Sequence, residues 1–101
     1  MGRHLPQGPY DFTTEAVSHI PERPGVYVLY NEEGCVLARS AVNLRREIAE
    51  VFEEPSECVK QHWPTAAEVD FCLPTEFEAR MIRLRHSLNV RGISHLCGSE
   101  S

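Results

Sequence analysis

The segment from Pro24 to Arg46, PGVYVLYNEEGCVLARSAVNLRR, constrains the fold more than any other part of the chain. Residues 25–30, GVYVLY, are rich in β-branched and aromatic side chains, which favour a strand. The acidic turn NEEG follows, and residues 35–40 have the composition of a returning strand. From residue 43 to residue 53, apolar side chains recur at helical spacing. The segment therefore predicts a β-hairpin that runs directly into a helix.

The rest of the chain predicts one further strand and three more helices. Residues 11–20 and residues 56–63 are expected to form short helices, each ended by a proline. Residues 67–73, AEVDFCL, alternate between apolar and polar side chains as a half-buried strand does. A longer helix begins after Pro74 and places four apolar side chains on one side: Phe77, Met81, Leu84 and Leu88.

These elements fit a single α+β domain. A chain of 101 residues is long enough for one modest core and too short for two. We predict a small three-stranded antiparallel sheet flanked by helices. The domain is expected to span residues 12–90, with residues 1–11 as a loose N-terminal lead-in and residues 91–101 as a polar C-terminal tail.

The sequence predicts a cytoplasmic protein without a membrane partner. It has no apolar run near the roughly 20 residues of a membrane helix, and its first residues, MGRHLPQGPYDF, lack the apolar core of a secretory signal. The cysteines are widely spaced, with no C-x-x-C pair to suggest a zinc site. We therefore expect four free thiols, at Cys35, Cys58, Cys72 and Cys97.

The net charge of −5 bears on the class of partner. Ten cations against fifteen acids argue against tight, non-specific binding to nucleic acid, which depends on contacts to phosphates. A small local patch of arginines remains compatible with this balance. A protein partner or a nucleic acid bound through such a patch are both open.

The order of elements, Gly25-Val26-Tyr27 in the first strand, and Asn43-Leu44 at the start of the next helix together resemble the GIY-YIG nuclease superfamily. The resemblance covers roughly residues 20–90. It implies a GIY-YIG-like fold. In that family, hydrolysis of a DNA phosphodiester uses a tyrosine in each hairpin strand, a helix arginine and a metal-binding glutamate in the last helix. These groups align a water molecule, stabilise the phosphate and hold one divalent cation.

The resemblance places only one of these reactive residues in this chain, which is Tyr27. The YIG triplet falls on Leu37-Ala38-Arg39, so that the second tyrosine is a leucine and the glycine is an arginine. The basic residue that follows falls on Ser40, and the helix arginine falls on Glu47. Arg46 is adjacent in sequence but lies about 100° away around the helix.

The metal-binding glutamate falls on Arg83 in this alignment. At ~5 Å and an effective dielectric constant near ~20, each unit of like charge costs roughly 3 kcal/mol, and a divalent ion doubles this cost. We therefore expect no metal and no other cofactor. Magnesium would be implied only if the chain were an active nuclease.

The sequence thus predicts a catalytically inactive nuclease-like domain that acts as an interaction module for a protein or a nucleic acid. The residues expected to bind an anion or nucleic acid are Arg39, Ser40, Asn43, Arg45, Arg46 and Arg83. Arg80 is instead expected to pair with Glu76 at i,i+4.

Two alternatives remain open from the sequence. The first is an active, metal-dependent DNA endonuclease with relocated residues, in which Tyr27 is the base. Its metal would be bound by carboxylates from Glu47, Asp70, Glu76 and Glu78. The second is a structural or self-associating domain whose acidic stretch, residues 47–57, faces solvent or a basic protein partner.

Overall fold

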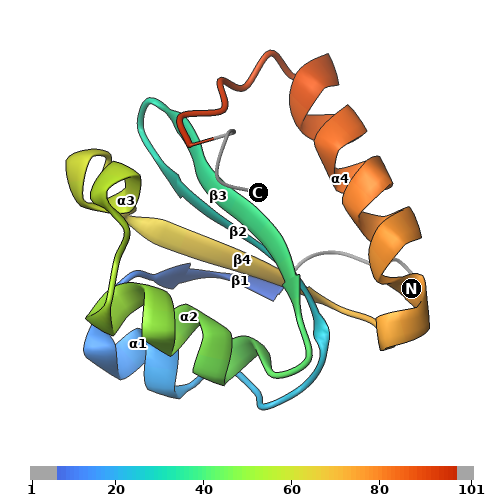
Figure 1. Ribbon diagram of the computed structural model, residues 1–101, viewed down its shortest axis with the longest axis horizontal. Coiled ribbons are helices and arrows are strands. Elements are labelled where there is room, and N and C mark those ends of the chain that lie inside the picture. Colours follow the sequence, from blue (N-terminus) through green and yellow to red (C-terminus); the bar gives the residue numbers. More distant parts are fainter. Residues whose placement is uncertain (1–6, 98–101) are drawn as a thin grey trace.

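Four antiparallel strands form one sheet in the order β1-β4-β2-β3, with helices on both sides (Figure 1). The structure, a computed structural model, describes residues 7–97. The strands are β1 (Gln7–Asp11), β2 (Gly25–Asn31), β3 (Gly34–Ala41) and β4 (Ala66–Phe71). The helices are α1 (Thr14–Ser18), α2 (Leu44–Glu53), α3 (Glu57–Gln61), the 3-10 turn η1 (Pro74–Glu76) and α4 (Phe77–Val90).

The sheet has one strand more than the sequence predicted. The additional strand is β1, which lies within the segment assigned to a loose lead-in. It is an edge strand that pairs only with β4, and an edge tolerates the missing N–H of Pro9. Because residues 7–11 contain glycine and proline, their composition indicated a loop and not a strand. Residues 1–6 of the predicted lead-in lie outside the described residues.

The β2–β3 hairpin forms as predicted, and its two faces pack against different helices. On one face, Tyr27 and Leu29 belong to the main core, which also contains Leu44 and Ile48 of α2. On the other face, Val28 belongs to a smaller cluster beneath α4. The alternation of side chains along a strand therefore divides β2 between the two helical layers that Figure 1 shows on either side of the sheet.

Helix α4 begins after η1, where the Glu76 carboxylate accepts a hydrogen bond from the Leu73 N–H at 2.9 Å. Among the four apolar side chains of its predicted core face, Leu88 is buried and the others are partly buried. None of the helices within residues 7–97 combines the length and the apolar character needed to cross a membrane.

The segment after α4 packs against β3 up to Cys97. The Cys35 N–H donates to the Ser94 carbonyl at 2.8 Å, and the Leu96 N–H donates to the Cys35 carbonyl at 2.8 Å. Residues 94–96 are thus held in a short parallel bridge, whereas the sequence predicted a frayed tail from residue 91. Residues 98–101 lie outside the described residues.

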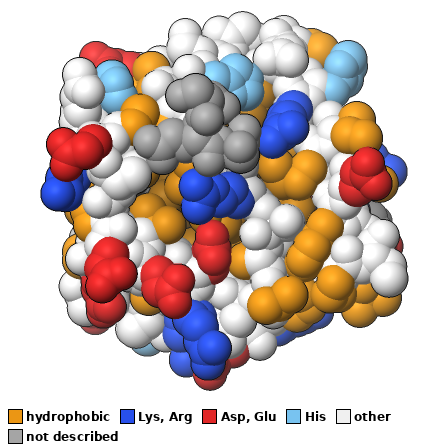
Figure 2. Space-filling view, in the orientation of Figure 1, with side chains coloured by type: hydrophobic (Ala, Val, Ile, Leu, Met, Phe, Trp, Pro, Cys, Tyr) orange, Lys and Arg blue, Asp and Glu red, His pale blue; other side chains and the backbone are white. Residues whose placement is uncertain are grey.

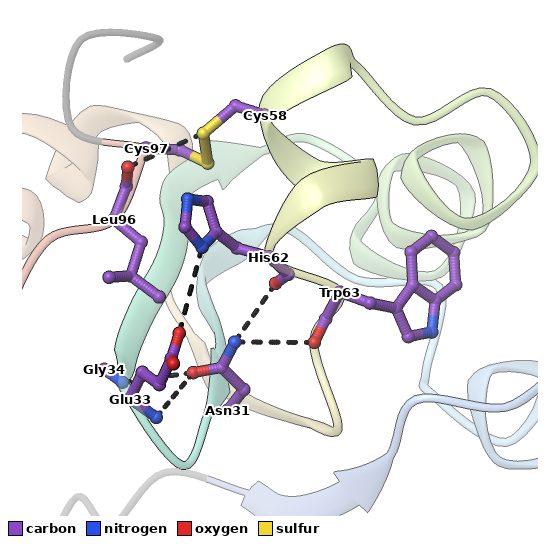
Figure 3. Close-up of polar contacts among 8 residues, drawn as sticks. All are labelled: Asn31, Glu33, Gly34, Cys58, His62, Trp63, Leu96 and Cys97. Atoms are coloured by element: carbon purple, nitrogen blue, oxygen red, sulfur yellow. Dashed lines mark hydrogen bonds and ion pairs between the residues drawn. A yellow bond between two sulfur atoms is a disulfide. The ribbon is translucent and has the colours of Figure 1, made fainter.

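A disulfide joins Cys58 of α3 to Cys97, so the expectation of four free thiols is wrong (Figure 3). Cys35 and Cys72 are free and buried. The two bonded cysteines are separated by 39 residues, and only the packing of the C-terminal segment beside α3 brings them together. Spacing along the sequence cannot reveal such a pair.

The same region holds the hairpin turn in place (Figure 3). The Asn31 Oδ1 accepts hydrogen bonds from the N–H groups of Glu33 and Gly34 at 2.7 and 3.1 Å. Its Nδ2 donates to the carbonyl of His62 at 3.2 Å. The turn is therefore tied to the end of α3.

Candidate functional site

Tyr27 lies in the middle of the sheet, where β2 is paired on both sides. Its Cα is in register with Arg39 on β3 and with Val69 on β4. The side chain points towards α2 and is only 1 % exposed. The tyrosine that the resemblance identified is therefore part of the core, with its hydroxyl at the edge of that core.

The hydroxyl of Tyr27 meets the carboxylate of Glu47 from the first turn of α2. It donates a hydrogen bond to Oε2 of Glu47 at 3.1 Å. The same oxygen lies 3.8 Å from Nη1 of Arg39, which forms an ion pair with it. We call these three residues, Tyr27, Arg39 and Glu47, the Tyr27 cluster. In this cluster a single carboxylate contacts both a neutral donor and a cation.

The environment of Tyr27 keeps its hydroxyl protonated. Burial is the largest cause, and it raises the pKa of Tyr27 above its usual value near 10. The negative charge of Glu47 and its hydrogen bond raise the pKa further, whereas the positive charge of Arg39 lowers it in part. The phenol is consequently a hydrogen-bond donor in this cluster.

Gly25 allows β2 to approach both β4 and α2. A Cβ at this position would overlap the carbonyl oxygen of Asp70 and lie 2.9 Å from the Leu44 side chain. Its backbone is not in the left-handed region, so the requirement for glycine is one of space. The glycine of the GVY sequence therefore positions Tyr27 against α2.

Asn43 and Arg45, two of the predicted anion-binding residues, serve structural roles at the start of α2. The Asn43 Oδ1 accepts a hydrogen bond from the Arg46 N–H at 3.0 Å and caps the helix. The Arg45 Nε donates to the Ile20 carbonyl at 2.7 Å, and its Nη1 lies 3.2 Å from the Glu22 carboxylate. These contacts fasten α2 to the loop before β2.

Of the remaining predicted anion-binding residues, Arg39 lies beside the Tyr27 hydroxyl in the Tyr27 cluster, whereas Ser40, Arg46 and Arg83 do not gather there. Arg46 is exposed on α2, and Ser40 lines a hollow between β3 and α4 with Arg39 and Met81. Arg83 is exposed on α4 and lines a cavity of about 240 Å³ against Val26 of β2. Because Val26 and the Tyr27 side chain point to opposite faces of the sheet, Arg83 lies across the sheet from the Tyr27 cluster. Anion binding by these residues stays a prediction.

Arg80 pairs with Asp70 and not with the residue that the sequence predicted. Its Nη1 lies 2.7 Å from Oδ2 of Asp70, so α4 is tied to β4. Glu76, the predicted partner, bonds instead to the Leu73 N–H. The alternation of apolar and polar residues predicted that Asp70 lies on the polar face of its strand. Which arginine pairs with it depends on how α4 crosses the sheet.

The carboxylates proposed for a relocated metal site do not form one group. Glu47 lies on the α2 side of the sheet, while Asp70 is in register with Val26 and lies on the α4 side. Within residues 7–97, no three His, Cys, Asp or Glu side chains are close enough to hold a metal ion together. The donor set of the described residues does not fit a metal centre built from three or more protein ligands.

Comparisons with known proteins identify the fold. The sequence matches no protein-family model and no curated protein. The structure is similar to two solved structures of the GIY-YIG N-terminal endonuclease domain of UvrC from Thermotoga maritima, both point mutants bound to the domain's catalytic divalent cation. In each case the TM-score is 0.61, the identity is 19%, and the match covers 74% of this chain and 87% of the UvrC domain. The chain therefore has the fold of the GIY-YIG superfamily.

Proposed function

We propose that this chain is a non-catalytic domain of GIY-YIG fold that acts as an interaction module. The observation that carries the proposal is the hydrogen bond from the Tyr27 hydroxyl to Glu47. Of the reactive residues of the family, the resemblance finds only this tyrosine in the chain. Its hydroxyl is engaged by a neighbouring side chain of the same protein.

The chemistry of this cluster is unfavourable for hydrolysis of a phosphodiester. A tyrosine acts as a general base only after it has lost its own proton, because the phenolate is the form that takes a proton from water. A general base works best with a pKa near the operating pH. Burial and Glu47 move the pKa of Tyr27 in the opposite direction. The hydroxyl of Tyr27 is also already committed as a donor.

Electrostatics at Glu47 act against a phosphate in the same place. A phosphodiester about 5 Å from the carboxylate would experience a repulsion of roughly 3 kcal/mol at an effective dielectric constant near 20. Arg39, the cation of the cluster, already pairs with that carboxylate. The position that the family gives to a phosphate-stabilising arginine thus carries a negative charge in this chain.

Two of the four carboxylates proposed for a relocated metal site already have side-chain partners among the described residues. Glu47 is engaged by Tyr27 and Arg39, and Asp70 is engaged by Arg80 at 2.7 Å. Arg83, which aligns with the metal-binding glutamate, carries the same sign of charge as the cation. No step of a reaction is therefore assigned to a metal.

A plasmid-nicking assay tests the proposal. Supercoiled DNA is incubated with the wild-type protein, Tyr27→Phe or Tyr30→Phe, with and without Mg²⁺ or Mn²⁺. Tyr30→Phe is a matched control, because Tyr30 is also a β2 tyrosine whose hydroxyl bonds to a glutamate, Glu68, at 3.4 Å. We expect all three proteins to nick no faster than buffer. Metal-dependent nicking that persists in Tyr30→Phe and is lost in Tyr27→Phe would establish the active endonuclease instead.

A further inference from the structure

Helix α4 has a second apolar side that faces away from the sheet. Ala79, Ile82, His86 and Val90 are all exposed, with Ile82 at 64% and Val90 at 71%. At about 100° per residue their spacing places them within roughly 80° of one another around the helix. We call these four residues the α4 outer stripe. Leu84 and Leu88 point to the opposite side and pack on the sheet.

Basic side chains border the stripe on both sides. Arg83 follows Ile82 at about 100° around the helix, and Arg85 lies about 60° away in the other direction. Both arginines are exposed, and within residues 7–97 neither forms a hydrogen bond or an ion pair through its side chain. Residues 77–91 contain four arginines and a single glutamate, Glu78. This helix is thus basic although the chain as a whole is acidic.

The acidic side chains lie mostly elsewhere. Figure 2 shows acidic side chains gathered at the lower left, over α1 and α2, and hydrophobic ones along the right, where Figure 1 places α4, with a smaller acidic area among them. Arg80 alone among the α4 arginines is neutralised, by Asp70 beneath the helix. The exposed surface of α4 therefore combines an apolar centre with arginines at both margins, and Glu78 lies on the Arg85 side, about 40° from Ile82 around the helix.

We propose that the α4 outer stripe docks an acidic amphipathic helix of a protein partner. Apolar side chains of that helix would cover Ile82 and Val90, and its carboxylates would meet Arg83 and Arg85. The inference rests on the proposed function as an interaction module, and it names the surface and the class of partner. It does not involve the contact between Tyr27 and Glu47, which lies on the α2 side of the sheet.

Charge and polarity favour this occupant over two others. A second copy bound through the same stripe would bring Arg83 and Arg85 of the two molecules together, and like charges at an interface are unfavourable. A nucleic acid would set its phosphates over Ile82 and Val90, which offer no hydrogen bond. An acidic amphipathic helix offers apolar side chains to the centre of the surface and carboxylates to the arginines at its margins.

The probe is a synthetic helical peptide of about 20 residues, long enough to form a helix, with leucine along one face and glutamate along both margins. Its binding to the full chain is measured by fluorescence anisotropy. The variants are Ile82→Glu and the double variant Arg83→Glu/Arg85→Glu. Val42→Glu is a matched control, because Val42 is 72% exposed and lies in the loop between β3 and α2 rather than on α4. Circular dichroism confirms that each variant is folded.

We expect both α4 variants to weaken peptide binding at least about tenfold, and Val42→Glu to change it less than about twofold. Added salt is expected to weaken binding to the wild type and to have less effect on the arginine variant. Equal affinity of the wild type and both α4 variants would overturn the inference. So would tighter binding of a duplex DNA that the arginine variant loses, or self-association of the free protein that Ile82→Glu abolishes. None of these results depends on nicking activity, so the inference and the proposed function fail separately.

Discussion

The Tyr27 hydroxyl and the Glu47 carboxylate are 20 residues apart in sequence and meet at 3.1 Å between β2 and α2. The contact joins the centre of the sheet to the helix that follows the hairpin. The resemblance also aligns both positions with residues that an active GIY-YIG nuclease uses for catalysis. The same pair therefore stabilises the fold and accounts for the proposed lack of cleavage.

Removing the acceptor should destabilise the protein. In Glu47→Ala the Tyr27 hydroxyl is left buried without this partner, and we expect the free energy of unfolding to fall by about 1–3 kcal/mol. Urea denaturation measures the change. Glu50→Ala, at an exposed position of the same helix, is the control and should remain within about 0.5 kcal/mol of the wild type. Equal effects of the two substitutions would contradict a stabilising role for the pair.

The space at Gly25 predicts a second stability effect. In Gly25→Ala the new Cβ overlaps the Asp70 carbonyl and crowds Leu44, so β4 or α2 must shift. We expect a loss of more than about 2 kcal/mol in unfolding free energy. Gly92→Ala is the comparison: nothing lies within 4 Å of a Cβ there, and only its φ of 71° opposes a side chain, for which we expect about 1 kcal/mol. A smaller loss at position 25 than at position 92 would argue against the close packing of β2.

The Cys58–Cys97 disulfide predicts the number of reactive thiols. Alkylation of the denatured, unreduced protein should label two cysteines, Cys35 and Cys72, and reduction should raise the number to four. Intact mass spectrometry reads both values. Four labelled cysteines before reduction would contradict the disulfide.

Loss of that disulfide should also lower stability. It closes a loop of 39 residues in the unfolded chain, so Cys97→Ser is expected to lower the free energy of unfolding by roughly 2–4 kcal/mol. Measurement with a reducing agent is the control. Reduction should bring the wild type close to the variant and leave the variant unchanged.

Local sequence patterns predicted most of the fold. The strands at residues 25–30, 35–40 and 67–73 and the helix at residues 43–53 differ from the observed elements by no more than two residues at either end. Each has either a clear apolar period or the composition of a strand. Strand β1 lacks one, because an edge strand with glycine and proline forms through pairing with β4.

Contacts between distant segments were harder to predict. The resemblance placed Glu47 at the position of the helix arginine, but it did not predict the hydrogen bond between Tyr27 and Glu47. The pairing of Arg80 with Asp70 rather than Glu76 depends on how α4 crosses the sheet. The disulfide likewise depends on where the C-terminal segment packs, which no local pattern records.

The ionisation of Tyr27 determines how the stability of the protein depends on alkaline pH. Because the pKa of Tyr27 is raised in the folded state, the folded protein retains a proton that the unfolded chain loses near pH 10. The stability from this group is fully present below about pH 10 and falls as the pH rises further. Tyr27→Phe removes this dependence, and denaturation curves across the alkaline range compare the two proteins.

Burial and the Glu47 carboxylate hold Tyr27 as a neutral hydrogen-bond donor. Ultraviolet absorbance titration of tyrosinate, recorded for the wild type and for Tyr27→Phe, tests it most directly. We expect the two titrations to coincide until alkaline unfolding begins, because Tyr27 adds no tyrosinate signal while the protein is folded. An additional ionisation at or below pH ~10 in the wild type, absent from Tyr27→Phe, would show that the phenol is available as a base and would contradict its role as a neutral donor.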